Sequence, residues 1–149
     1  MKNKMVLLSI KGKYADQILS NIKHYEYRRK IPVLQPPFIL LLNVSREIVG
    51  SCIVNKIHTL PIDELIERTV DRTPQTKEGL LKYYAELDYG SAMEISEPIK
   101  ESKTIKIIDM PIIQNYCYIE KPPSKWDRIW NRFEHRLGKH PVYKQLELF

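Results

Sequence analysis

Lys23, Glu26 and Arg28 form the densest group of chemically capable side chains in this sequence. Their spacing brings an amine, a carboxylate and a guanidinium close together near one sheet edge. Lysine and arginine bind phosphate, and a glutamate can accept a hydrogen bond from a base amino group such as cytosine N4. The amine and the carboxylate also suit acid–base chemistry if burial lowers the lysine pKa. The structural alternative is an exposed strand face held together by salt bridges.

Basic residues are concentrated in the same part of the chain. The protein has 149 residues and a formal net charge of +6. Residues 1–30 contain eight Lys or Arg and two Asp or Glu, an excess equal to that net charge. Two of these basic residues are Lys11, which ends the run Ser9-Ile10-Lys11, and Lys13, which follows it closely. Such a bias is typical either of a solvated basic surface or of a site for a polyanion such as nucleic acid.

The elements that must position these residues are short. Residues 5–10 are apolar and predict a buried strand, and residues 14–20 predict a helix. Asn21 can adopt the left-handed conformation that ends a helix. Residues 23–28 alternate as a strand does, with Tyr25 and Tyr27 on one face and the charged side chains on the other.

Further strands and helices follow in the middle of the chain. Strands are predicted at residues 38–44 and 48–58, joined by a hairpin at Ser45-Arg46-Glu47, and later at 92–99, 104–108 and 112–119. Gly50 indicates a bulge or a close backbone approach. Pro61 and Thr76 predict the beginnings of two helices. This order of elements predicts an α+β fold, with a small, mostly antiparallel β-barrel or curved sheet flanked by helices.

The last 30 residues differ from the rest. Ser124 can cap a helix that ends at Gly138, and Trp126 to Leu137 form an apolar stripe beside basic residues. We expect this amphipathic helix to dock on the domain. The predicted organisation is therefore a domain over residues 1–119 and an extension over residues 120–149.

Several kinds of site are not expected. The five glycines form no phosphate-binding loop, and the four histidines lack the spacing of a helical zinc site, so we predict no cofactor and no metal. The longest apolar run, residues 37–44, is much shorter than the roughly 20 residues that span a bilayer, so no membrane partner is expected. No secretory signal is recognised. Cys52 and Cys117 suit reduced thiols, which favours a cytoplasmic protein.

The segment from Leu8 to Pro32 closely resembles the opening of the ASCH family, the activating-signal-cointegrator homology domains. The family signature is a strand reading S-I-K, a short helix and then G-x-K-x-x-E-x-R. Lys23, Glu26 and Arg28 occupy its K, E and R, and Asn21 replaces its glycine. The likeness continues in Ile48-Val49-Gly50, in Tyr89-Gly90-Ser91-Ala92 and in Gln114-Asn115-Tyr116, and it covers about residues 5–119.

This resemblance implies a PUA-like fold and an RNA-related role, with the K-x-x-E-x-R group in a cleft. Our first hypothesis is a nucleic-acid-binding protein whose basic cleft binds RNA or a modified nucleotide, with a regulatory role as one option. The residues expected to contact the nucleic acid are Lys11, Lys13, Tyr14, Lys23, Glu26, Arg28, Arg29 and Tyr116, with Tyr25 as a further stacking residue.

Two alternatives remain open. The family also includes amidohydrolases that act on N4-acetylcytidine and a metal-independent ribonuclease, so Lys23 and Glu26 would be catalytic if this chain is an enzyme. Lys23 matches the lysine of those amidohydrolases, and Glu26 occupies the position of their threonine. In the third hypothesis the protein is an adaptor that binds a protein partner through the helix from Trp126 to Leu137.

Overall fold

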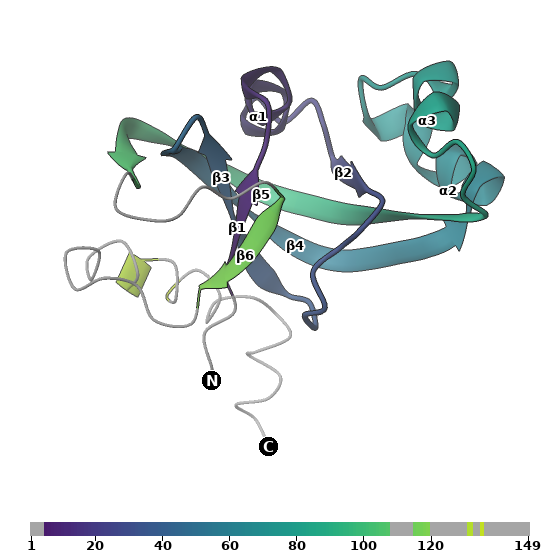
Figure 1. Cartoon of the computed structure of the whole chain (residues 1–149). Helices are drawn as coiled ribbons and strands as arrows, with labels where there is room; N and C mark the ends of the chain where they lie inside the picture. Colours follow the sequence, from purple (N-terminus) through teal and green to yellow (C-terminus); the bar gives the residue numbers. More distant parts are fainter. Residues whose placement is uncertain (1–4, 108–114, 120–130, 133–134, 136–149) are drawn as a thin grey trace.

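The computed structural model describes residues 5–107, 115–119, 131–132 and 135. Over these residues the chain forms a six-stranded sheet with three α-helices and a 3-10 turn (Figure 1). The elements, in chain order, are β1 (Met5–Ser9), α1 (Gly12–Leu19), β2 (Tyr25–Arg28), β3 (Phe38–Val44), β4 (Glu47–Pro61), α2 (Ile62–Thr69), η1 (Val70–Arg72), α3 (Lys77–Tyr83), β5 (Tyr89–Lys106) and β6 (Tyr116–Ile119). The prediction of an α+β fold is confirmed.

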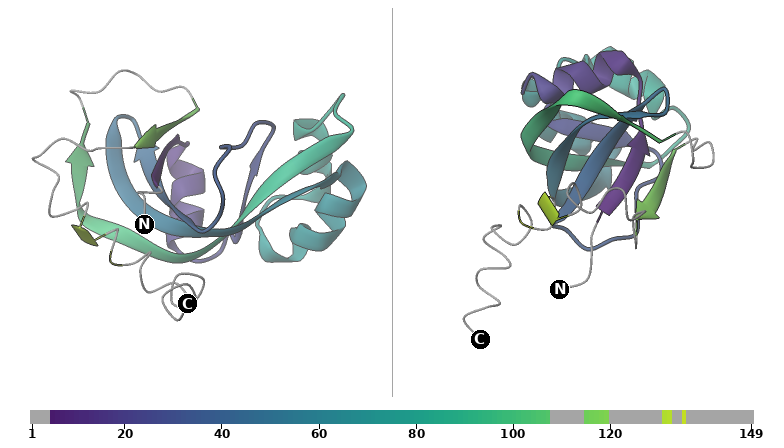
Figure 2. Two further views of the ribbon diagram at one scale, coloured as in Figure 1. Left: turned by 90° about the horizontal axis from the view of Figure 1, so that it is seen from below. Right: turned by 90° about the vertical axis from the view of Figure 1, so that its left-hand side faces the viewer.

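The strand order is β2-β5-β4-β3-β1-β6. Every neighbouring pair is antiparallel except β1 and β3, which are parallel. The described strands do not close on themselves, so the predicted barrel is not confirmed. The two edge strands, β2 and β6, have four residues each and pair only with β5 and β1, respectively. The sheet is strongly curved but open (Figure 2).

β4 and β5 extend together beyond β3 as an arm, and β2 pairs with β5 along it from Ser91 to Glu94 (Figure 1). Helices α2 and α3 lie at the far end of this arm, while α1 lies over the main part of the sheet. The sequence predicted two separate strands at 92–99 and 104–108, and this was wrong because β5 is continuous. Shifts in register with β4 and a positive φ of 51° at Glu97 allow one strand to pass through Pro98.

Both faces of the central strands are covered. In β1, Met5 and Leu7 belong to one apolar cluster, whereas Val6 and Leu8 belong to the cluster on which α1 packs. This burial on both sides explains why β1 and β3 are continuously apolar instead of alternating. A third cluster joins β2 and β5 to α2 and α3 and includes Tyr27, Ala92, Leu65 and Leu80.

Three local turn predictions are confirmed. Asn21 has a φ of 62° and ends the α1 segment. Ser45 and Arg46 both have positive φ, as a two-residue hairpin requires, and Glu47 already belongs to β4. Thr76 caps α3, because its Oγ1 accepts a hydrogen bond from the Gly79 N–H at 3.0 Å. Stereochemistry within a few residues decides each of these turns.

The predicted C-terminal helix from Trp126 to Leu137 lies almost entirely outside the described residues. Arg132, which is described, forms an ion pair with Glu101 of β5. None of the helices in the described part of the chain has the length and apolar character needed to cross a membrane.

Gly50 has a packing role that can be tested. A Cβ at this position would lie 2.5 Å from Leu19 Cδ2 and 2.7 Å from the Ile99 carbonyl oxygen, which is backbone and cannot move aside easily. We expect Gly50→Ala to lower the free energy of unfolding by about 1–3 kcal/mol in urea denaturation. Gly12→Ala is the control, because its Cβ would only meet Val44 Cγ1 at 3.6 Å. Equal stability of the two variants would contradict this account of Gly50.

Candidate functional site

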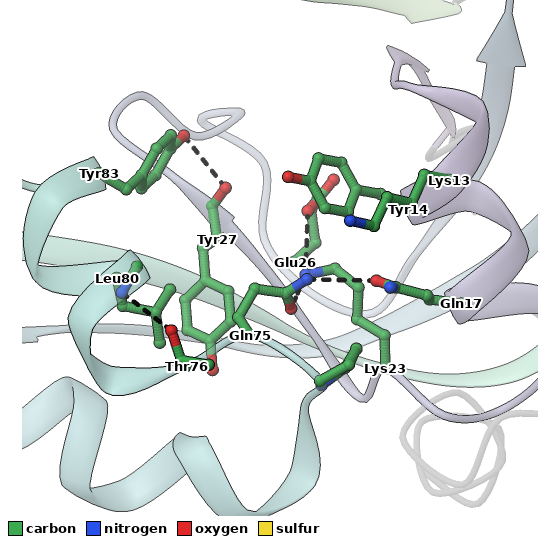
Figure 3. Close-up of a pocket in the computed structure, with 12 residues that line it drawn as sticks. Lys13, Tyr14, Gln17, Lys23, Glu26, Tyr27, Gln75, Thr76, Leu80 and Tyr83 are labelled. Atoms are coloured by element: carbon green, nitrogen blue, oxygen red, sulfur yellow. Dashed lines mark hydrogen bonds and ion pairs between the residues drawn. The ribbon is translucent and has the colours of Figure 1, made fainter.

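A cavity of about 320 Å³ lies between α1, β2 and α3 (Figure 3). We call it the Lys23 cavity. Helix α1 supplies one wall and α3, with the loop before it, supplies the opposite wall. The residues that line it are Lys13, Tyr14, Gln17, Lys23, Glu26, Tyr27, Pro74, Gln75, Thr76, Gly79, Leu80 and Tyr83.

The turn after α1 sets the position of Lys23. Its backbone N–H donates to the Gln17 carbonyl at 3.0 Å, and the left-handed Asn21 redirects the chain toward β2. β2 then pairs with β5, with Glu26 opposite Met93. Backbone hydrogen bonds therefore hold both residues: Lys23 is bonded to α1, and the strand that carries Glu26 is bonded to β5.

The Lys23 ammonium group is almost completely removed from solvent, with a residue exposure of 3%. Its Nζ donates to Gln75 Oε1 at 2.7 Å and lies 3.7 Å from Glu26 Oε1. The same atom lies 5.6 Å from the centre of the Tyr14 ring and 5.0 Å from that of Tyr27. Cation–π attraction adds to the two polar contacts.

Burial lowers the pKa of Lys23 from 10.5 to about 8. Loss of hydration is the main cause, and the nearby Arg28 acts in the same direction. Glu26 opposes both effects through its negative charge. The lysine is therefore mainly protonated near neutral pH but loses its proton far more readily than an exposed lysine does.

Glu26 is shared between two cations. Its Oε2 accepts from Arg28 Nη2 at 3.3 Å, while its Oε1 faces Lys23. Arg28 Nη2 also donates to the Ser9 carbonyl at 3.0 Å, which ties β2 to the end of β1. The three side chains expected from the sequence to form one group do so.

Gln75 connects the two walls of the cavity. Its Oε1 accepts from Lys23 and from Thr73 Oγ1, and its Nε2 donates to Gln17 Oε1 at 3.2 Å. Because both donors point at the oxygen, the orientation of the amide group is defined. Figure 3 shows Gln75 and Lys23 meeting between α1 and α3.

Two tyrosines of the Lys23 cavity, Tyr27 on β2 and Tyr83 on α3, remain neutral phenols. Burial raises the pKa of both Tyr27 and Tyr83. The Tyr27 hydroxyl donates to Thr69 Oγ1 at 2.7 Å, and the Tyr83 hydroxyl donates to the Tyr27 carbonyl at 3.2 Å. Arg29 packs on the Tyr83 ring and donates from Nε to the Tyr83 carbonyl. These bonds fix the ring of Tyr83 at the cavity wall.

A second cavity, of about 690 Å³, shares part of its lining with the first. We call it the Arg28 cavity. The shared residues are Tyr14, Glu26, Tyr27 and Tyr83. Its remaining lining comes from Ser9, Ile10, Lys11, Gly12, Arg28, Val44 and Ser45. Because four side chains border both cavities, the two are adjoining parts of one site.

The structure brings most of the residues predicted from the sequence to this site. Lys13 and Lys23 line the first cavity, Lys11 and Arg28 line the second, and Tyr14 and Glu26 line both. The sequence analysis did not select Gln17, Gln75 or Tyr83. Gln75 and Tyr83 lie more than 50 residues from Lys23 in the chain, so no local pattern in the sequence indicated them.

Three other predicted residues lie elsewhere. Arg29 borders the site only indirectly, through Tyr83. Tyr116 donates its hydroxyl to the Ile31 carbonyl and packs against the apolar cluster under α1, away from both cavity linings. Tyr25 is buried against His58 and is part of the α2–α3 cluster. The described residues also contain no group of three or more His, Cys, Asp or Glu able to hold a metal ion.

Comparison with known proteins identifies the fold. No protein-family model matches the chain, and no curated protein matches it in sequence. A crystal structure of ASCH from Zymomonas mobilis has 18% identity and a TM-score of 0.70, covering 79% of this chain and 89% of that one. A tyrosine-to-phenylalanine mutant of that protein has 17% identity and a TM-score of 0.70, covering 80% and 92% of the two chains. A serine-to-alanine mutant has 17% identity and a TM-score of 0.71, covering 80% and 91%. The chain therefore has the ASCH domain fold, in agreement with the resemblance that begins with the segment from Leu8 to Pro32.

The lowered pKa of Lys23 predicts how stability depends on pH. Because the pKa is lower in the folded than in the unfolded chain, the unfolded chain binds more protons between about pH 8 and pH 10.5. Stability therefore rises with pH through this window. Relative to Lys23→Met, we expect the wild type to gain about 2 kcal/mol in free energy of unfolding between about pH 7 and pH 9.5.

Urea denaturation at the two pH values measures this gain. Subtracting the Lys23→Met value at each pH removes contributions from the other titrating groups. Lys103→Met, at an exposed position of β5, should behave as the wild type does. If wild type and Lys23→Met change in parallel, the pKa of Lys23 is not lowered by folding.

Proposed function

We propose that this chain is a member of the ASCH family that binds single-stranded RNA and holds one unpaired base in the Lys23 cavity. The observation that carries the proposal is a buried Lys23–Glu26–Arg28 group bordered by tyrosine rings in a cavity. Fixed polar groups in a largely aromatic and apolar cavity are typical of small-ligand sites. The volume of about 320 Å³ lies within the usual range for such sites, roughly 300–1,000 Å³.

Tyr14 and Tyr83 support stacking with a base. Both are partly exposed and border both cavities, and Arg29 and the Tyr27 carbonyl hold Tyr83 in place. Sequence-specific recognition of RNA mostly uses unstacked bases that lie against aromatic side chains. A base between α1 and α3 would contact these rings while its edge meets Glu26, Lys23 and Gln75.

The charges around the site support an anionic ligand. Four cations, Lys11, Lys13, Lys23 and Arg28, line the two cavities, and Glu26 is the one acidic residue in these linings. Lys11 and Lys13 are exposed and so can reach the backbone of a bound strand. Each phosphate neutralised by such a residue makes RNA binding more sensitive to salt.

Tyr14 provides a direct test of this function. We expect Tyr14→Leu to weaken binding of a short single-stranded RNA by about tenfold, because stacking on an aromatic ring contributes about 1–3 kcal/mol per base. Tyr14→Phe should retain most of the affinity because it keeps the ring. Fluorescence anisotropy with a labelled oligonucleotide at low and moderate salt measures both effects.

The matched control is Tyr89→Leu. Tyr89 is 61% exposed at the start of β5 and lines neither cavity, so its replacement should leave affinity unchanged. The proposal is wrong if wild-type protein does not bind RNA at low salt, or if Tyr14→Leu and Tyr89→Leu bind equally well.

A second candidate function is catalysis at Lys23, and the lowered pKa favours it. An amine with a pKa of about 8 is a better base or nucleophile near neutral pH than an ordinary lysine. The adjacent Glu26 carboxylate would accept or return a proton. Suitable substrates are N4-acetylcytidine, whose amide bond would be hydrolysed, or an RNA phosphodiester cleaved without metal.

Turnover assays test this alternative. Purified protein would be incubated with N4-acetylcytidine, and separately with labelled RNA in the presence of a chelator. An enzyme should show a rate that increases between about pH 6 and pH 8, as Lys23 loses its proton, and that is lost in Lys23→Met. No turnover, or turnover that persists in Lys23→Met, excludes Lys23 catalysis.

A further inference from the structure

Arg28 is held by only one of its terminal nitrogens. Its Nη2 donates to the Ser9 carbonyl at 3.0 Å and to Glu26 Oε2 at 3.3 Å, which uses both hydrogens on that nitrogen. A guanidinium has five N–H donors in a rigid plane. The described residues offer no partner to the other three, on Nε and Nη1. The side chain is 17% exposed and lines the Arg28 cavity.

The charges around Arg28 are not balanced within the protein. Lys23 and Arg28 share the single carboxylate of Glu26. The side chain of Lys23 is 3% exposed, that of Glu26 6% and that of Arg28 17%. One positive charge thus has no counter-ion in the described part of the protein. The Nε and Nη1 groups of Arg28 face the solvent of the Arg28 cavity, because Asn43 Oδ1 is the one fully buried side-chain atom without a partner among the described residues. Lys11 adds a further cation at the exposed side of the same cavity.

We propose that the Arg28 cavity is a phosphate-binding subsite, separate from the Lys23 cavity, that takes one backbone phosphate of the bound strand on Arg28 and Lys11. The inference rests on the proposed function, because it assigns the two adjoining cavities to two parts of one nucleotide. The base occupies the Lys23 cavity, and its phosphate occupies the Arg28 cavity.

The reverse assignment fits less well. The Lys23 ammonium already donates to Gln75 and faces Glu26, and its cavity is the smaller one, with Tyr27, Leu80 and Tyr83 among its lining. A guanidinium edge with free, coplanar N–H groups matches the oxygens of a phosphate, to which arginine commonly binds in a bidentate manner. The fixed Nη2 holds that edge in place before the ligand arrives. Lys23 therefore contacts the base and not the backbone, which revises the role expected from the sequence.

The experiment replaces single phosphates of the RNA. A short single-stranded oligonucleotide would be made with one neutral methylphosphonate linkage at each position in turn, and each version titrated by fluorescence anisotropy. We expect one linkage whose neutralisation weakens binding by about tenfold, the usual effect of removing a charge-assisted hydrogen bond. The same linkage should have a smaller effect in Arg28→Lys, which keeps the charge but loses the bidentate edge.

A second variant, Lys11→Ala, tests the same linkage without changing Arg28 or Glu26. Lys11 is exposed, so its removal leaves the Arg28 bonds to Ser9 and Glu26 in place. We expect it to weaken binding of the unmodified RNA by about threefold and to reduce the effect of the same linkage. Lys103→Ala, outside both cavity linings, should change neither quantity.

The outcomes separate the two proposals. In one outcome the wild type binds RNA, but the effect of every neutral linkage is the same in wild type, Arg28→Lys and Lys11→Ala. In that case the phosphate subsite is wrong and RNA binding stands. Should Arg28→Lys fail to fold, Lys11→Ala decides whether the subsite exists, because it should still reduce the effect of the neutral linkage. If unmodified RNA does not bind to the wild type, both proposals are wrong. Inorganic phosphate is then added as a competitor. It would block a general anion site at millimolar concentration, but it would not block a site that binds the phosphate only together with the attached base.

Discussion

Lys23 keeps an ammonium group where almost no water reaches it, and three distant segments of the chain make this possible. Glu26 on β2 supplies a carboxylate, Gln75 before α3 supplies an acceptor, and the rings of Tyr14 and Tyr27 lie around the amine. Removing any of the polar partners would leave a buried charge with less compensation. The positions of α1, β2 and α3 relative to one another are therefore coupled through one side chain.

The open sheet explains how these segments meet. The β4–β5 arm carries α2 and α3 beyond the main sheet and then brings α3 opposite α1, where Gln75 hydrogen-bonds to Gln17. The cavity thus lies between a helix packed on the sheet and a helix held at the end of the β4–β5 arm, with Glu26 and Tyr27 of β2 in its lining.

The likeness to ASCH from Zymomonas mobilis places this arrangement in a known fold at 18% identity. Identity at that level establishes the fold but not the activity. The functional proposals therefore depend on what the cavities contain: a shared carboxylate, an arginine with a free edge, and partly exposed tyrosines at their common border. These features favour a ligand with a planar group and a negative charge, as a nucleotide has.

Local sequence was sufficient for most of the elements and for the charged group of the site. Continuous apolar runs predicted β1 and β3, and the turn residues Asn21 and Thr76 predicted where helices end or begin. The spacing of Lys23, Glu26 and Arg28 also predicted that they would meet, because they are separated by only a few residues around one short strand. The turns and the Lys23–Glu26–Arg28 group depend on backbone geometry over only a few residues.

Only the tertiary structure decided the rest. Gln75 lies 52 residues from Lys23, and no periodicity links them. Tyr116 and Tyr25 have suitable chemistry for stacking, but packing turns one toward Ile31 and buries the other against His58. The division into two cavities and the sharing of one carboxylate by two cations follow from how α1, β2 and α3 pack. The sequence by itself determined which groups are present, and packing determined which of them share a site, because burial and long-range contacts depend on the whole fold.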